Sequence, residues 1–142
     1  MKKNLLILFI GTSVSISVFA QKMDENKVPA AATEAFKHQF PGIKGKWEKE
    51  KDNYEVNFKK DNKAMSAVID AHGTILETET DIAIKDLPAG IADYVKTHYK
   101  GAPIKEAAQI IRSTGETIYE AEVNKKDVLF DASGKFIKEE KD

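Results

Sequence analysis

The sequence predicts an α+β fold, with one meandering antiparallel sheet and two helices packed on one of its faces. Three observations lead to this prediction. An amphipathic segment that opens with a proline occurs twice, at 28–42 and 87–101. A Tyr-Glu segment of alternating apolar and polar residues follows each copy, and an Asp-Ala-x-Gly turn comes after it. Helices followed by antiparallel strands bury one face of a sheet and leave the other face open.

Residues 1–20 have the pattern of a secretory signal peptide. Lys2 and Lys3 precede an apolar run that begins at Leu5, and Val18-Phe19-Ala20 offers a small-residue cleavage site. Glycine, serine and threonine interrupt this run, which makes a retained membrane anchor less favoured. The sequence therefore predicts cleavage before Gln21 and a periplasmic or secreted protein without a stable membrane anchor. Residues 21–142 are expected to form a single domain.

The charge and cysteine content narrow the possible functions. The chain has 22 basic and 23 acidic side chains, and residues 1–20 hold two of the lysines and none of the acids, so the mature net charge is 20 − 23 = −3. This balance argues against a nucleic-acid-binding protein, which would carry a concentrated basic face. The chain has no cysteine, so its folding must depend on a hydrophobic core.

Both predicted helices carry an apolar stripe with four-residue spacing. The stripes consist of Ala32, Phe36 and Phe40 in the first helix, and Leu87, Ile91, Val95 and Tyr99 in the second. Pro29 suits the first helical position, and Pro41-Gly42 stops the first helix. Residues 21–27 are polar and are expected to form a loose leader into this helix.

The strand signals follow the same order in both halves. Tyr54–Phe58 alternates strictly, Ala64–Asp70 is the returning strand, and Ile75–Thr80 follows the first Asp-Ala-x-Gly turn. Residues 46–50 are a weaker candidate for a preceding strand. In the second half, 119–123, 131–134 and 136–140 match the Tyr-Glu strand, the turn and the last strand. The two copies span residues 28–80 and 87–140.

This pattern predicts the composition of the core. The expected core residues are Phe36, Phe40, Ile91 and Val95 on the helices, packed against Tyr54, Val56, Phe58, Tyr119, Ala121 and Val123 on the strands.

The duplicated helix opening, Tyr-Glu strand and Asp-Ala-x-Gly turn, placed behind a signal peptide, resemble the PepSY-like family, whose members are likened to the beta-lactamase inhibitor protein. The resemblance covers nearly all of residues 28–140. It implies two tandem helix-plus-four-strand units that form one antiparallel sheet in an exported bacterial protein. These motifs are mainly structural, so they indicate the fold better than the function.

Catalytic and metal-binding patterns are weak. Ser66, Ser113 and Ser133 lack the Gly-x-Ser-x-Gly setting of a nucleophile. Glu34 and His38 share a helix face, but a solvated surface explains them more simply than a metal site. Carboxylates spaced by two, such as Glu77 and Glu79, are expected on wet strand faces, not opposite each other across a pocket. The sequence therefore predicts a protein that is not an enzyme and has no cofactor or metal.

The best remaining hypothesis is an exported binding or interaction module of an inhibitor-like kind that uses the open face of the sheet. Its candidate binding residues are Trp47, Glu55, Asn57, Ile118, Glu120 and Glu122. Trp47 is either a core residue or an exposed anchor, and the second reading makes it the centre of the site. The expected partner is an exported or cell-envelope protein. The alternative function is a periplasmic carrier of a small ligand or metal.

Overall fold

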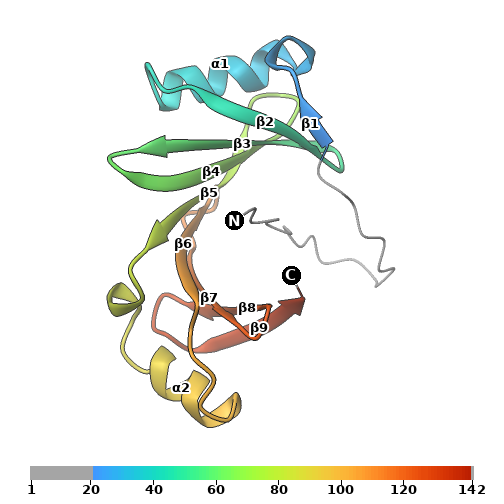
Figure 1. Ribbon diagram of the computed structural model, residues 1–142. Helices are drawn as coiled ribbons and strands as arrows, with labels where there is room; N and C mark the ends of the chain where they lie inside the picture. The colour runs from blue at the N-terminus through green and yellow to red at the C-terminus, as the bar shows by residue number, and fades with distance from the viewer. Residues whose placement is uncertain (1–20, 142) are drawn as a thin grey trace.

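The computed structural model describes residues 21–141, so the expected signal peptide and its cleavage site lie outside the described residues. Within them, the chain forms one nine-stranded antiparallel sheet in the order β1 to β9, together with two α-helices (Figure 1). This confirms the predicted α+β class.

The elements follow one another closely along the chain. They are β1 (Gln21–Met23), the 3₁₀ helix η1 (Glu25–Lys27), α1 (Ala30–Gln39), β2 (Gly45–Glu50), β3 (Asn53–Lys60), β4 (Lys63–Ile69), β5 (Ile75–Ile82), η2 (Ile84–Asp86), α2 (Ile91–His98), β6 (Glu106–Arg112), β7 (Thr117–Val123), β8 (Lys126–Asp131) and β9 (Phe136–Lys141). Each α-helix is thus followed by four strands.

The segment before α1 is ordered, contrary to the prediction of a loose leader. β1 pairs with β2 and places Met23 opposite Trp47, and η1 then leads into the helix. Pairing with β2 satisfies backbone groups that would otherwise lie on an open strand edge. Pro29 directly precedes α1, and the Phe40 amide closes the helix by donating to the Phe36 carbonyl at 2.8 Å.

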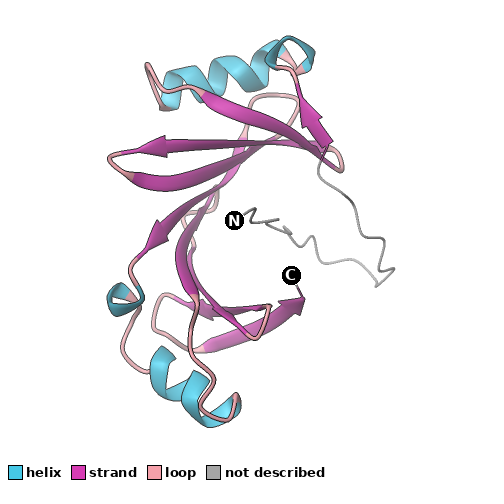
Figure 2. Cartoon of the chain, viewed as in Figure 1, coloured by secondary structure: helices cyan, strands magenta, loops and turns pink. Residues whose placement is uncertain are grey.

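Both helices pack on the same face of the sheet, here called the helix face. One row of facing residues crosses the strands from Phe58 through Met65, Thr80, Gln109 and Tyr119 to Phe130. At one end of this row, Phe36 of α1 meets Phe58, with ring centroids 5.1 Å apart. At the other end, Tyr94 of α2 meets Phe130 edge-on at 5.4 Å. Figure 2 shows both helices on the outside of the curved sheet.

The predicted core is confirmed. Phe36, Phe40, Ile91 and Val95 are buried, as are Val56, Phe58, Ala121 and Val123 on the strands. Tyr54 and Tyr119 are partly buried and pack against these clusters. The core has one cluster under each helix, because each helix covers only its own part of the long sheet.

The two Asp-Ala-x-Gly segments form closely similar turns. Asp70 Oδ1 accepts the amides of His72 and Thr74, both at 2.9 Å. Asp131 Oδ1 accepts those of Ser133 and Lys135 at 2.9 and 3.0 Å. A β-bulge lies beside each turn. The pairing register shifts between Val68 and Ile69 in one half and between Leu129 and Phe130 in the other. Bulges bend and twist a sheet, which contributes to the curvature in Figure 1.

Phe36→Ala should lower the free energy of unfolding by about 3–5 kcal/mol, because it removes a buried ring that contacts Phe40, Trp47 and Phe58. Phe136→Ala is the matched control, since that ring is 36% exposed and should cost clearly less. Chemical denaturation measures both. Equal losses for the two variants would contradict the packing of α1 described here.

Candidate functional site

The face of the sheet opposite the helices, here called the inner face, is formed by the alternate residues of the same strands. Glu55 of β3 lies on it, opposite Glu48 on β2 and Val68 on β4. The register continues this row to Glu77 on β5 and Arg112 on β6. Because the helices occupy the outer side of the bend, the inner face is concave (Figure 1).

Carboxylates dominate the inner face. They project from β2, β3 and every strand from β5 to β9: Glu48, Glu50, Glu55, Glu77, Glu79, Asp81, Glu106, Glu120, Glu122, Asp127 and Glu140. Fewer cations share these rows, namely Lys22, Lys46, Lys59, Arg112 and Lys138. The concave side of the molecule therefore carries a strong negative potential, which curvature concentrates.

Glu55 has the most perturbed environment on this face. Its side chain hydrogen-bonds to Ser66, and it lies near the carboxylates of Glu50 and Glu48. Burial, reinforced by those neighbouring charges, raises the pKa of Glu55 to about 8. At neutral pH this carboxyl is largely protonated, so the face holds a buried proton as well as fixed charges.

Two opposing influences act on the pKa of Glu77. Burial raises the pKa of Glu77, while the Arg112 guanidinium opposes that shift, with its Nε 3.5 Å from Glu77 Oε2. Arg112 also reaches Glu116 at 3.0 Å. It therefore joins β5 to the turn between β6 and β7 through two carboxylates.

An apolar patch interrupts the acids in the second half of the face. Ile118 is buried and packs with Ile110 and Leu129. Ile118 lies directly opposite Ile110 across β6 and β7. Ile110, Ile118 and Leu129 are only 5%, 1% and 5% exposed. The cluster therefore fills the concave side between β6, β7 and β8, and the accessible part of the inner face is polar.

The structure brings five of the six sequence-predicted residues together on the inner face: Glu55, Asn57, Ile118, Glu120 and Glu122. Glu55, Ile118 and Glu120 are buried, whereas Asn57 and Glu122 are half-buried. Their register places Glu55 and Asn57 in the first half of the sheet and the other three in the second.

Trp47 does not belong to this surface. It is 3% exposed, lies opposite Val56, and meets the Phe36 ring edge-on at 5.7 Å under α1. The hypothesis that Trp47 is an exposed anchor on the open face is therefore wrong, because the register of β2 turns its side chain toward the helix.

The expectation that the paired carboxylates lie on wet strand faces is also wrong for most of them. Glu50, Glu77, Glu79 and Glu120 are buried, and Glu48 is half-buried. A flat sheet would leave such side chains in water, but bending brings neighbouring strands' side chains together on the concave side. Sequence reasoning also missed Arg112 and Ile110, because it assigned no strand to residues 106–112.

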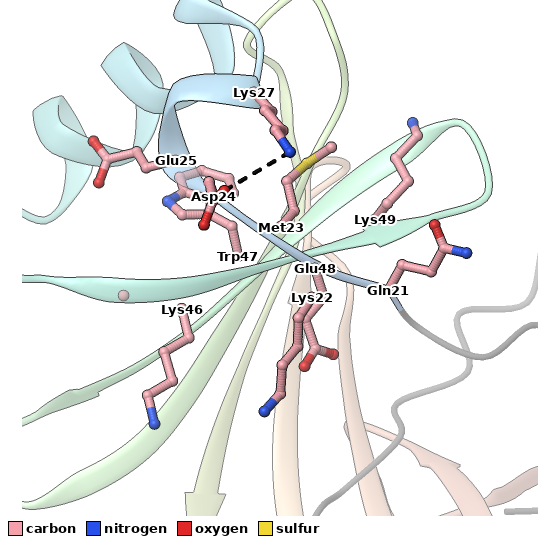
Figure 3. A pocket seen from close by; sticks show the side chains of 11 residues that line it. Gln21, Lys22, Met23, Asp24, Glu25, Lys27, Lys46, Trp47, Glu48 and Lys49 are labelled. Atoms are coloured by element: carbon pink, nitrogen blue, oxygen red, sulfur yellow. Dashed lines mark ion pairs between the residues drawn. The ribbon is translucent and has the colours of Figure 1, made fainter.

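A cavity of about 680 Å³ lies at the β1 end of the sheet, lined by Gln21–Glu25, Lys27 and Gly45–Lys49. In Figure 3, Lys22, Lys46 and Glu48 extend to one side of the strands, while Trp47 and Met23 point toward the helix side. Lys27 and Asp24 pair at 3.8 Å near its rim. Its walls are mainly long charged side chains.

The other chemistry considered from the sequence finds little support among the described residues. Within residues 21–141, no cluster of histidine and carboxylate side chains is arranged to hold a metal ion. Ser66 hydrogen-bonds to Glu55 and Ser133 Oγ donates to Asp131 at 2.6 Å, so both serve structure. No helix in the described part of the chain is long and apolar enough to cross a membrane.

Several solved structures share this fold. A DUF2874 family protein from Bacteroides uniformis is 17% identical, with a TM-score of 0.71 over 79% of this chain and 88% of that one. A protein from Bacteroides eggerthii, described as "putative periplasmic", has 15% identity and a TM-score of 0.72 over 80% and 88%. A BLIP-like protein from Bacteroides fragilis has 22% identity and a TM-score of 0.60 over 78% and 83%. At these identities the likeness concerns the fold alone. A search of the curated proteins finds no match.

The sequence model of one family matches this chain twice, over residues 15–77 and 67–138. That family is described as "Putative beta-lactamase-inhibitor-like, PepSY-like". The two matches together span most of the chain, in agreement with the resemblance carried by the duplicated motifs. The chain belongs to the PepSY-like, beta-lactamase-inhibitor-like family.

Proposed function

We propose that this chain is an exported, non-enzymatic interaction module whose inner face binds a protein of the cell envelope or periplasm. The observation that carries the proposal is the division of the sheet into two unlike faces. Both helices cover one face, while the other is concave and lined by carboxylates. The helices leave the inner face uncovered, so its half-buried side chains can contact a partner.

The unit that builds this face is proposed to occur twice within one domain spanning 21–142. In this description, residues 28–80 and 87–140 are copies of one helix-plus-four-strand unit. The matching order of α1, β2–β5 and α2, β6–β9 supports it, as do the two equivalent bulges. The double match of the family model supports it independently.

The charge of the inner face indicates the partner's chemistry. Covering the half-buried carboxylates, such as Glu48, Glu106 and Glu122, with a neutral surface would remove them from water without compensation, which is costly. A surface rich in lysine or arginine would pair with them and would also be steered toward the concave side. The partner is therefore proposed to be a protein with a basic, convex surface, and the association should weaken at high salt.

The periplasmic location is proposed on two grounds. One is the signal-peptide pattern of residues 1–20. The other is that a solved structure of the same fold is described as "putative periplasmic".

A second candidate function, a carrier of a small ligand, rests on the cavity beside β1. Its volume lies within the range of small-molecule sites. Trp47 on its wall is 3% exposed, however, so it offers little aromatic surface to a ligand.

Native mass spectrometry of the chain purified from periplasm separates the two functions. The interaction module should appear at the mass of the polypeptide alone or with a co-purifying protein. A bound small molecule that disappears in a Lys46→Glu variant would favour the carrier, because Lys46 lines the cavity.

Charge reversal on the inner face should abolish partner capture. Glu48→Lys and Glu122→Lys suit this test because both side chains are half-buried and can tolerate a longer cation. Glu34→Lys is the matched control, since Glu34 is exposed on α1. Proteins retained from periplasmic extract by the wild type and the control, but lost from both inner-face variants, are the expected result. Loss in the Glu34→Lys variant alone would move the site to the helix face.

Glu55→Gln should change how stability depends on pH. The folded pKa of Glu55 is raised to about 8, above the roughly 4.3 of an unfolded glutamate. Between these values the folded chain binds more protons than the unfolded chain, so wild-type stability falls as pH rises. Glu55→Gln removes this dependence and should be more stable than wild type near pH 8, with the difference shrinking toward pH 4. Parallel curves from urea denaturation across this range would contradict the buried state of Glu55.

A further inference from the structure

The two edges of the sheet differ. At one end, β1 covers the outer edge of β2. At the other end, no strand within residues 21–141 pairs with the outer edge of β9. A strand edge of this kind presents a row of backbone donors and acceptors that can accept another strand.

β9 is held in place as a strand. Glu139 accepts a hydrogen bond from the Tyr99 hydroxyl and one from Lys126 Nζ, both at 2.6 Å. These contacts fix β9 to the segment after α2 and to β8. The open edge is therefore pre-formed, which lowers the entropic cost of adding a strand to it.

β5 shows what an added strand on β9 would look like. Ile75 faces Ile69 just before one bulge, as Phe136 faces Phe130 just before the other. If these two pairs are aligned, each residue of β9 corresponds to a residue of β5, with Phe136 equivalent to Ile75. The outer edge of β5 is covered by β6, and the Ser113 amide donates to the Leu76 carbonyl at 2.8 Å. The carbonyl at the corresponding position on β9 belongs to Ile137.

Two large apolar side chains are exposed at the start of β9, ahead of the charged residues 138–141. Phe136 and Ile137 are 36% and 42% exposed. The Phe136 ring stacks on Tyr94, with centroids 5.1 Å apart, and Tyr94 stacks on His98 at 3.9 Å. Exposed apolar side chains beside an open strand are a typical feature of sites that accept another chain.

We propose that the outer edge of β9 accepts an antiparallel strand from a partner protein, with an acidic residue opposite Lys138. The pairing of β5 with β6 indicates the charge that the partner residue should carry. Glu77 of β5 faces Arg112 of β6, and Lys138 stands where Glu77 would be. The charge at this position is therefore positive on β9 and negative on β5. Among the ion pairs of the described residues, Lys138 pairs only with its strand neighbour Glu140. A carboxylate on the added strand would complement Lys138. The backbone edge of β9 borders the inner face, on which the Lys138 side chain lies. Accepting a strand at this edge goes beyond the function proposed for that face.

A second copy of this chain is a poor occupant by the same alignment. In the first half of the chain β2 is the strand equivalent to β6, so it would have to pair with β9 of the other copy. The edge of β2 needed for this pairing is already covered by β1. The register would also place Glu140 opposite Glu50 and Lys141 opposite Lys49. Like charges directly opposite destabilise an antiparallel pair. The geometry therefore favours a different protein.

A pair of peptides tests the proposal. The first has the sequence of residues 106–113, and the second carries Arg112→Glu in the same sequence. By fluorescence anisotropy, the wild-type chain should bind the Arg112→Glu peptide about fivefold more tightly than the unmodified one, the effect of exchanging a repulsive for an attractive cross-strand pair. A Lys138→Glu chain should reverse the preference. Lys63→Glu, exposed and far along the sheet in β4, should keep the wild-type order.

Hydrogen exchange locates the bound peptide. Protection should appear over residues 136–141. It should persist in Glu48→Lys, which alters the inner face and the cavity beside β1, both at the far end of the sheet from β9. Equal binding of both peptides, no binding, or protection on other strands would overturn the proposal. Sedimentation velocity provides a further test, because a dimer that dissociates in Lys138→Glu would place a second copy at the edge in place of a foreign strand.

Discussion

The alternation of side chains along β3 and β7 is the constraint on which the rest of the molecule depends. Successive residues of a strand point to opposite faces, so burying Val56 and Ala121 under the helices commits Glu55 and Glu120 to the inner face. A slip of one residue would exchange these sets and put carboxylates beneath α1 and α2. The hydrophobic core and the acidic concave face are therefore two consequences of one register.

The Asp-Ala-x-Gly turns connect that register to the helices. A Cβ atom on Gly73 would lie 2.6 Å from the Ala31 carbonyl oxygen, and one on Gly134 would lie 3.0 Å from that of Ala89. Both glycines have positive φ, 88° and 84°, which other residues rarely adopt. Each turn can thus press against the start of its helix only because glycine is present. The helix is held there by the turn and along its length by the apolar stripe.

The sequence was sufficient where local pattern determines structure. The amphipathic helices, the Tyr-Glu strands and the turns each depend on spacing within a few residues, and all were predicted with their core. The strand β1 was missed because three residues of polar sequence show no period. The strand β6 was missed because its Glu, Ala and Gln favour helix, and pairing between β5 and β7 overrides that preference.

The sheet face to which the Trp47 side chain points could not be predicted from its own strand, because it depends on the neighbouring hairpin. Its orientation is set by the hairpin that joins β2 to β3, where Glu50 faces Asn53 and Lys51 has a φ of 51°. A two-residue loop at this point fixes Trp47 opposite Val56, hence beneath α1. The hairpin length was the available signal, but the charged sequence of the loop lacks the Asn-Gly pair that usually reveals it. The buried carboxylates were equally inaccessible, because sheet curvature arises from bulges that only pairing reveals.

The composition of the inner face is more costly than the fold requires. An antiparallel sheet whose second face meets only water can carry threonine, lysine and other well-hydrated side chains at no penalty. Here Glu55 is buried near Glu48 and Glu50, and its raised pKa records the free energy needed to ionise it there. The helix-face core and the backbone ladder must offset this cost. Natural proteins retain such destabilising groups chiefly where activity needs them, and stability is lost at the site of function and regained elsewhere. The concave acids are on these grounds the part of the molecule least explained by folding, and this supports the proposal that they serve recognition.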